Sequence, residues 1–217
     1  MRFFILLLTS LMLLGLTACK THEVTPTNVA LDPHGESELL PDAVVAPVVR
    51  ERRRMDLDQL KATISQVTEG LSWTEDRNGT TVDLFDELSG TLGKPNYIET
   101  TSEDLTASPL FQKFMTDAAN GVCVQAVARD LERTRSERVI ISAVEPYDRV
   151  ETAPDAVNEN LKMLLRRFHG RNVAVDSDQL NPWAWLFETS TFMADDPIKG
   201  WEAVCVALMT HPDFYSY

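Results

Sequence analysis

The sequence predicts an all-α protein, an irregular bundle of about six helices joined to a flexible N-terminal tether. Apolar residues recur at three- and four-residue spacings over most of residues 56–210, as they do on the buried faces of helices. Most of these runs begin at a capping residue or a proline and end near glycine or proline. The strict alternation that is typical of strands is almost missing. We therefore expect a helical globular domain over residues 51–217.

The N-terminal end has the pattern of an export signal. Arg2 is followed by an almost unbroken apolar run over residues 3–16, so a charged region precedes an apolar one, as in a secretory signal. A helix that spans a bilayer needs about 20 apolar residues, and this run is shorter. We interpret residues 1–18 as a signal peptide.

The apolar run ends in Leu16-Thr17-Ala18-Cys19, which resembles the lipobox of bacterial lipoproteins. The resemblance implies cleavage before Cys19 and attachment of acyl chains such as palmitate to it. Two or three acyl chains anchor a protein to a membrane almost permanently. Lys20 stands where an aspartate would retain a lipoprotein at the inner membrane, which implies the outer membrane. An ordinary signal peptide cleaved nearby, or an uncleaved core helix, is the alternative.

Residues 19–50 have the composition of a Pro-rich tether, because four prolines lie among polar and acidic residues with no apolar period. The chain has a formal net charge of −13, which becomes −14 when residues 1–18, with their single cation, are removed. Such an acidic chain repels phosphate backbones, so we expect no nucleic-acid partner. The expected partners are the membrane, through the lipid, and another envelope or secreted protein.

Two helices are expected in the first part of the domain. Asp56 and Gln59 have the spacing of a capping box, and the helix that follows ends before Gly70. A polar turn is expected at residues 75–79, after which Thr81 is placed to cap a second helix.

The longest helix is expected to begin at Ser108-Pro109, because serine caps helices and proline suits their first position. A bend is expected at Asn120-Gly121. Its expected buried face consists of Phe111, Phe114, Met115, Ala118, Val122, Ala126 and Leu131.

Three more helices are expected over residues 154–170, 178–192 and 196–211. Residues 139–144 suit a short strand and a buried helical turn equally well, and the pattern does not decide between them. The aromatic tail Phe214, Tyr215 and Tyr217 is expected to fold back on the core, because three exposed rings together are costly.

A disulfide is expected between Cys123 and Cys205, the two cysteines that lipidation leaves over. Each lies between two valines on a helix face that should point inward. Two buried, unpaired thiols are the alternative.

No catalytic residue, cofactor or metal site is expected. The chain has neither a Cys-x-x-Cys-His nor a Gly-x-Ser-x-Gly motif. His169 and His211 are expected at the ends of helices, where histidine favours the negative end of the helix dipole. The carboxylate pairs Glu103-Asp104 and Asp195-Asp196 are expected to cap helices or face water.

Arginines 52–54 precede the start of a helix, where positive charge opposes the helix dipole. We therefore expect another partner to hold them, such as an acidic surface of the same domain.

The chain has four tryptophans, at positions 73, 183, 185 and 201. We expect them in the core and not in the lining of a ligand groove, because large rings usually fill the space between helices.

Four short motifs of the domain occur in a recognisable order. They are Arg53-Arg54-Met55-x-x-x-Gln59-Leu60, Leu92-Gly93-x-Pro95-x-Tyr97, Phe111-x-Lys113-Phe114, and Trp201 followed by His211-Pro212-Asp213-Phe214-Tyr215. In this order they resemble the helical modules of large exported planctomycete-type cytochrome proteins. The resemblance implies a helical envelope module that works beside a secreted partner, but the haem-attachment motif is missing, which removes electron transfer.

These features favour a lipid-anchored envelope protein that acts as a scaffold or binding subunit without catalysis. The alternative is a hydrolase of envelope polymers or a redox accessory module. Side chains of Asp, Glu or His that converge in a cleft would favour this alternative.

Overall fold

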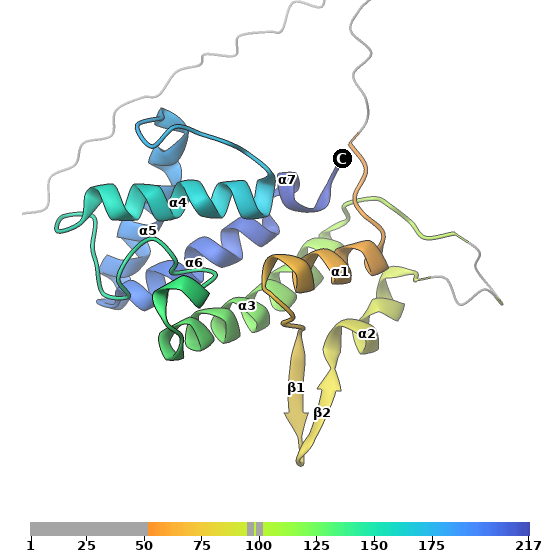
Figure 1. Ribbon diagram of the computed structural model, residues 1–217. Helices are drawn as coiled ribbons and strands as arrows, with labels where there is room; N and C mark the ends of the chain where they lie inside the picture. Colours follow the sequence, from red (N-terminus) through yellow and green to blue (C-terminus); the bar gives the residue numbers. More distant parts are fainter. Residues whose placement is uncertain (1–51, 95–97, 99–101) are drawn as a thin grey trace, which may run out of the picture. The chain divides into compact units, whose positions relative to one another are not determined.

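Helices make up most of the described part of the chain, as the sequence predicts (Figure 1). The computed structural model describes residues 52–94, 98 and 102–217, so the expected signal peptide, Cys19 and the tether lie outside the described residues. The elements are α1 (Leu57–Val67), β1 (Thr74–Arg77), β2 (Thr80–Asp83), α2 (Leu84–Ser89), the 3-10 turn η1 (Gly90–Leu92), α3 (Pro109–Glu132), η2 (Arg135–Glu137), α4 (Pro154–His169), η3 (Asp178–Leu180), α5 (Asn181–Ala194), α6 (Pro197–Thr210) and α7 (Pro212–Tyr215).

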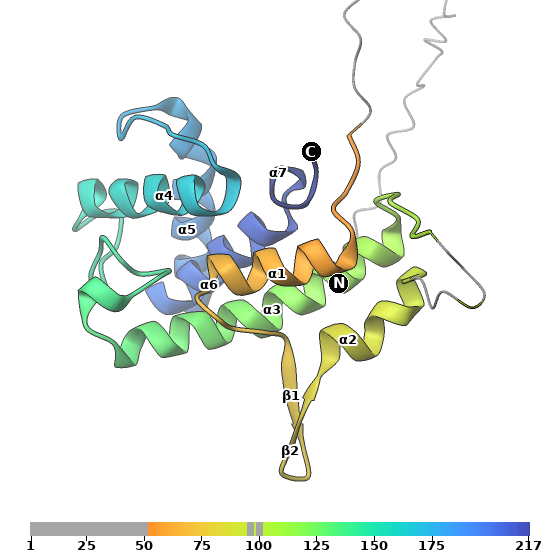
Figure 2. The same cartoon turned by 45° about the vertical axis from the view of Figure 1, so that its right-hand side comes forward.

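The core forms around α3 and α6. Helix α6 packs against α3 and against α5, and α4 contacts both α5 and α6. Helix α1 runs alongside α3, and the β1–β2 hairpin projects away from the bundle (Figures 1 and 2). None of the helices in the described residues is long and apolar enough to cross a membrane.

The helix starts confirm the capping residues that the sequence indicates. Asp56 and Gln59 form the expected capping box, and the side chains of Ser108 and Asp196 cap α3 and α6. Gly170 ends α4 in the left-handed conformation that glycine adopts most easily.

The structure corrects the expected turn and helix after residue 74. A short antiparallel hairpin replaces the polar turn, Thr81 lies in β2, and Asp83 is the residue that caps α2. Asn78 and Gly79 both have positive φ, as the two central residues of a type I′ turn must. The Asn-Gly pair is a hairpin signal in the sequence, but the flanking strands are too polar to show alternation.

Helix α3 differs from its expected form in two places. It runs without interruption through Asn120 and Gly121, and Gly121 lies so close to the Trp73 indole that a Cβ would come within 2.6 Å of it. Leu131, expected in the core, is 40% exposed, while Asp130 beside it is fully buried.

The expected disulfide is present. It joins Cys123 of α3 to Cys205 of α6, with 5.8 Å between the Cα atoms.

The aromatic tail folds back on the core only in part. Phe214 and Tyr215 pack into the core as expected, but the prediction is wrong for Tyr217, which is 70% exposed. Its backbone pairs with Arg53 at the edge of the domain, which leaves the ring facing outward.

Residues 139–144 form neither a strand nor a helical turn. The buried carboxylate of Asp130 accepts hydrogen bonds from the backbone amides of residues 139–141, at 2.5–2.9 Å. Asn160 of α4 accepts from the next two amides and donates to the carbonyl of Ile140. Two buried side chains therefore replace the backbone partners of regular structure.

We predict that Asp130→Ala lowers the free energy of unfolding by about 3 kcal/mol or more, because it leaves three buried amides without an acceptor. Asp130→Asn keeps one oxygen and should cost less. Glu132→Ala, on the exposed side of the same helix, should change stability by less than about 0.5 kcal/mol. Urea denaturation measures all three, and equal stability of the two alanine variants would contradict the structure.

Gly200 of α6 lies close against side chains of α5. A Cβ there would lie 2.8 and 2.9 Å from ring carbons of Phe187 and would also meet the hydroxyl of Thr191. We predict that Gly200→Ala lowers the free energy of unfolding by about 1–3 kcal/mol through overpacking. Gly90→Ala is the matched control, because Gly90 has an ordinary helical φ of −58° and open space around it. It should be neutral or stabilise by up to about 1 kcal/mol in the same thermal or urea unfolding measurement.

Candidate functional site

The described chain begins beside its own C-terminus. The amide of Met55 donates to the carbonyl of Tyr215 at 2.7 Å, and Arg53 and Tyr217 exchange two backbone hydrogen bonds at 3.0 and 3.3 Å. We call this pairing of residues 53–55 with residues 215–217 the terminal seam. Both views show the first described residues beside the C-terminus (Figures 1 and 2).

Arg54 holds the seam against the rest of the domain. Its side chain is 2% exposed, lies 2.6 Å from the Glu103 carboxylate, and packs over the Phe111 ring at 4.7 Å. The guanidinium also donates to the backbone carbonyls of Met55, Asp104 and Thr106. The expected acidic partner within the same domain is thus present for Arg54, and Arg52 pairs with Asp213.

Glu103 connects this ion pair to the start of α1. Its second oxygen accepts the backbone amide of Leu57 at 3.2 Å, which places negative charge at the helix N-terminus. The Glu103 carboxylate therefore offsets the unfavourable interaction between Arg54 and the dipole of α1.

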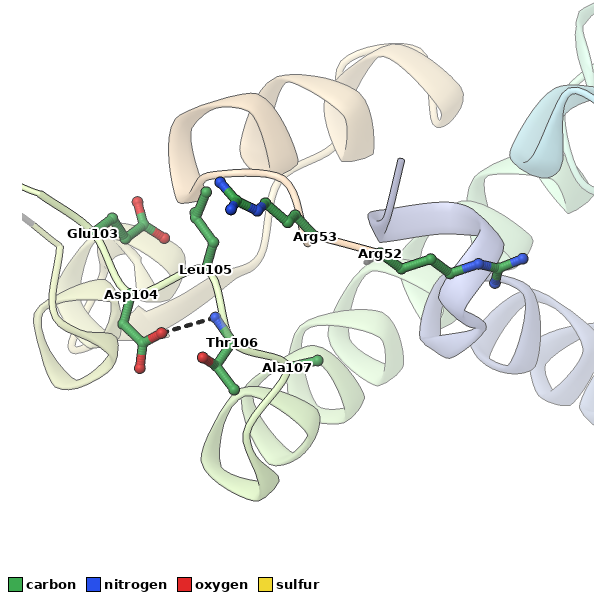
Figure 3. Close-up of a pocket in the computed structure, with 7 residues that line it drawn as sticks. All are labelled: Arg52, Arg53, Glu103, Asp104, Leu105, Thr106 and Ala107. Atoms are coloured by element: carbon green, nitrogen blue, oxygen red, sulfur yellow. Dashed lines mark hydrogen bonds between the residues drawn. The ribbon is translucent and has the colours of Figure 1, made fainter. Parts of the chain in front are cut away.

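A polar hollow of about 400 Å³ opens on one side of the seam, and Figure 3 shows its lining. Arg53 extends toward Leu105, whereas Arg52 points away toward α7. The Asp104 carboxylate accepts the amide of Thr106 at 2.8 Å, and hydrogen bonds from the hydroxyl and amide of Thr106 lower the pKa of Asp104. The remaining lining residues are Glu103 and Ala107.

A second hollow, of about 410 Å³, lies between α1 and the end of α4; we call it the α1/α4 groove. It combines apolar side chains with a charged pair, because Arg167 lies 3.3 Å from Glu69 at its edge. Its lining consists of Met55, Thr63, Gln66, Val67, Glu69, Arg167, Phe168, Asp213 and Phe214.

Arginines also hold the C-terminal end of α1. Arg129 donates to the carbonyls of Thr68 and Glu69, and Arg167 donates to that of Val67. Cations there complement the helix dipole and satisfy carbonyls that the helix leaves free. These arginines of α3 and α4 thus have partners within the domain.

Asp213, at the edge of the α1/α4 groove, belongs to a cluster with His169 and His211, which we call the His169 cluster. One ligand-type atom from each of the three side chains lies within 4.8 Å of the others. The two imidazole rings lie 4.8 Å apart, and the Trp183 ring lies 5.6 Å from His169 and 6.0 Å from His211. The positions of the two histidines at helix ends were predicted, but their meeting was not.

The hydrogen bonds of His169 define its tautomer. Its Nε2 lies 3.0 Å from the carbonyl oxygen of Leu208, which only accepts, so Nε2 carries the proton. Nδ1 is buried and has no hydrogen-bond partner among the described residues. Burial lowers the pKa of His169, and the bond to Leu208 opposes this shift only in part.

Asp213 and His211 are fixed from several sides. Arg52 and Arg171 each pair with one oxygen of the Asp213 carboxylate. The amide of Asp213 donates to Nδ1 of His211 at 3.1 Å, which caps α7. The cluster therefore joins the end of α4, the start of α7 and the chain before α1.

The other candidate residues stay apart. Asp195 pairs with Arg149, and Asp196 caps α6, so neither forms a dyad with the other. Of the four tryptophans, Trp73 and Trp201 are in the core, while Trp185 is 65% exposed. The expectation of four core tryptophans is therefore wrong for Trp185.

Comparisons with known proteins give no match: no protein-family model, no curated protein and no solved structure is similar to this chain. The resemblances to lipoproteins and to cytochrome-associated helical modules stay predictions.

We predict that acidification destabilises the domain through His169. Because its pKa in the folded state lies below the ordinary value of 6.5, the unfolded chain takes up the proton first as the pH falls. The contribution of His169 to stability is therefore complete above pH 6.5 and is lost as the pH falls through the lowered pKa.

Thermal unfolding at a series of pH values between about 7.5 and 5.5 measures this loss. His169→Gln keeps a donor for the Leu208 carbonyl but does not titrate, so its melting temperature should fall less over this interval. Parallel curves for the two proteins would contradict the prediction.

Proposed function

We propose that this chain is an exported, lipid-anchored protein of the bacterial outer membrane that acts as a scaffold or binding subunit. The observation that carries the proposal is the sequence Leu16-Thr17-Ala18-Cys19 at the end of a short apolar run. The helical domain that follows supplies the binding part, and its α1/α4 groove lies beside the terminal seam. The partner in this proposal is another envelope or secreted protein.

The lining of the α1/α4 groove supports binding in preference to catalysis. Its apolar lining includes Met55, which is partly exposed, and Phe168 and Phe214, which are almost fully buried, and the Arg167–Glu69 pair lies at its edge. The hydroxyl of Thr63 donates to the carbonyl of Gln59 at 2.8 Å, so it is not poised beside a base. A mixed apolar and charged lining is typical of a surface that takes up a peptide segment.

One observation favours the hydrolase alternative: the side chains of His169, His211 and Asp213 lie close together. Convergent titratable groups are the usual sign of acid–base chemistry. However, both oxygens of Asp213 are paired with arginines, and Nδ1 of His211 accepts a backbone amide. The binding role therefore has the better support.

The anchor is tested by Cys19→Ser in the full chain, with Lys20→Arg as the control. We expect the wild type and the control to sediment with membranes and to show the mass of a cleaved, acylated protein. The serine variant should leave the membrane fraction or stay uncleaved, because a hydroxyl does not replace the thiol in lipid transfer. An unchanged membrane fraction and unchanged mass in the serine variant would contradict the anchor.

The binding role is tested with a photo-crosslinking amino acid in the groove. Gln66 lines the groove and is exposed, while Ala62 lies on the same helix, is also exposed and is outside the lining. We expect a discrete crosslinked product from position 66 and none from position 62. The product should disappear when Thr63→Arg fills the groove. Identical products from both positions would contradict the proposal.

A further inference from the structure

We propose that His169, His211 and Asp213 bind one divalent transition-metal ion of the Zn²⁺ class. Two imidazole nitrogens and one carboxylate are a common ligand set for zinc, with a fourth position open to water or a partner. This inference goes beyond the proposed function and does not depend on the lipid anchor. It also departs from the expectation, drawn from the sequence, that the chain has no metal site.

His169 has the arrangement of a metal ligand before the metal arrives. Its Nε2 proton is held by the carbonyl of Leu208 at 3.0 Å, so the lone pair is on Nδ1. Histidines that bind metals almost always donate their other nitrogen to such an oxygen, which fixes the ring and its tautomer. The free nitrogen is buried and lacks a hydrogen-bond partner among the described residues, which is costly unless something occupies it.

His211 and Asp213 supply the other two ligands from one short segment. Nδ1 of His211 lies 3.8 Å from Oδ2 of Asp213, and one ring nitrogen of His169 belongs to a set of three ligand-type atoms, one from each residue, that lie within 4.8 Å of one another. Ligand atoms around tetrahedral zinc lie about 3.3 Å apart, so side-chain adjustments of roughly 1.5 Å or less close the site. The costs are the hydrogen bond from the Asp213 amide to His211 and the pairing of Asp213 Oδ2 with Arg171.

The surrounding charges favour a modest affinity. Arg52 and Arg171 hold the Asp213 carboxylate in place, as supporting residues do in metal sites, but their positive charge opposes a cation. The nitrogen donors favour a transition metal over Mg²⁺ or Ca²⁺, which prefer oxygen ligands. The site should therefore discriminate by metal type.

The chain provides its own optical reporter. The Trp183 ring lies 5.6 Å from His169, so Ni²⁺ or Cu²⁺ in the site should quench its fluorescence. Trp183→Phe should remove most of this quenching, whereas Trp185→Phe, two residues away on the same helix, should keep it. This readout reports occupancy and requires no activity.

The decisive measurement is calorimetric titration of the full chain with Zn²⁺, in protein without a histidine tag. All variants carry Cys19→Ser so that no free thiol competes, since Cys123 and Cys205 are bonded to each other. We expect one equivalent of Zn²⁺ to bind and Mg²⁺ to give no signal. His169→Gln, His211→Gln and Asp213→Asn should each weaken binding about tenfold or more.

The matched control uses the other two of the four histidines, in a His22→Gln/His34→Gln double variant. It should bind Zn²⁺ as tightly as the parent protein. Circular dichroism checks that each variant is folded, and Zn²⁺ should raise the melting temperature of the parent but not that of His169→Gln. Absence of one-equivalent binding at millimolar Zn²⁺, or its loss in the control alone, would overturn the proposal.

Discussion

The buried guanidinium of Arg54 is the constraint on which the candidate site depends. A charge with 2% exposure is tolerated only when it is paired and hydrogen-bonded, and Glu103 together with three carbonyl oxygens meets that condition. These contacts fix the chain before α1 against the segment before α3. The backbone pairing with residues 215–217 then places the C-terminus beside them.

Other charged side chains of the domain also bind groups within it. In a chain of net charge −13, many of the arginines meet internal acceptors: Arg54 lies near the start of α1, and Arg129 and Arg167 bind carbonyls at its end. The carboxylate of Asp130 orders an irregular buried segment in the same way, through backbone amides. Buried polar side chains thus replace sheet hydrogen bonds where the helices do not reach.

The framework brings the two proposed binding places together at Asp213. The α1/α4 groove is lined by Asp213 and the His169 cluster contains it, while Arg52, the residue before the terminal seam, pairs with its carboxylate. A ligand in the groove or a metal in the cluster would act on the same carboxylate. If both proposals hold, binding at one of these places would be coupled to binding at the other through this side chain.

The sequence by itself determined the helical class and most helix starts, because caps and apolar periodicity act within a few residues. The Cys123–Cys205 pairing was also predictable, although the two residues lie 82 positions apart, because the chain has only one other cysteine. The β1–β2 hairpin was missed because its strands are polar, although Asn78-Gly79 signals the turn. The ion pair of Arg54 joins residues 49 positions apart, and the His169 cluster brings His169 beside His211 and Asp213, which lie more than 40 positions further along the chain. Only tertiary packing decided these contacts, since no local pattern specifies which helix ends meet.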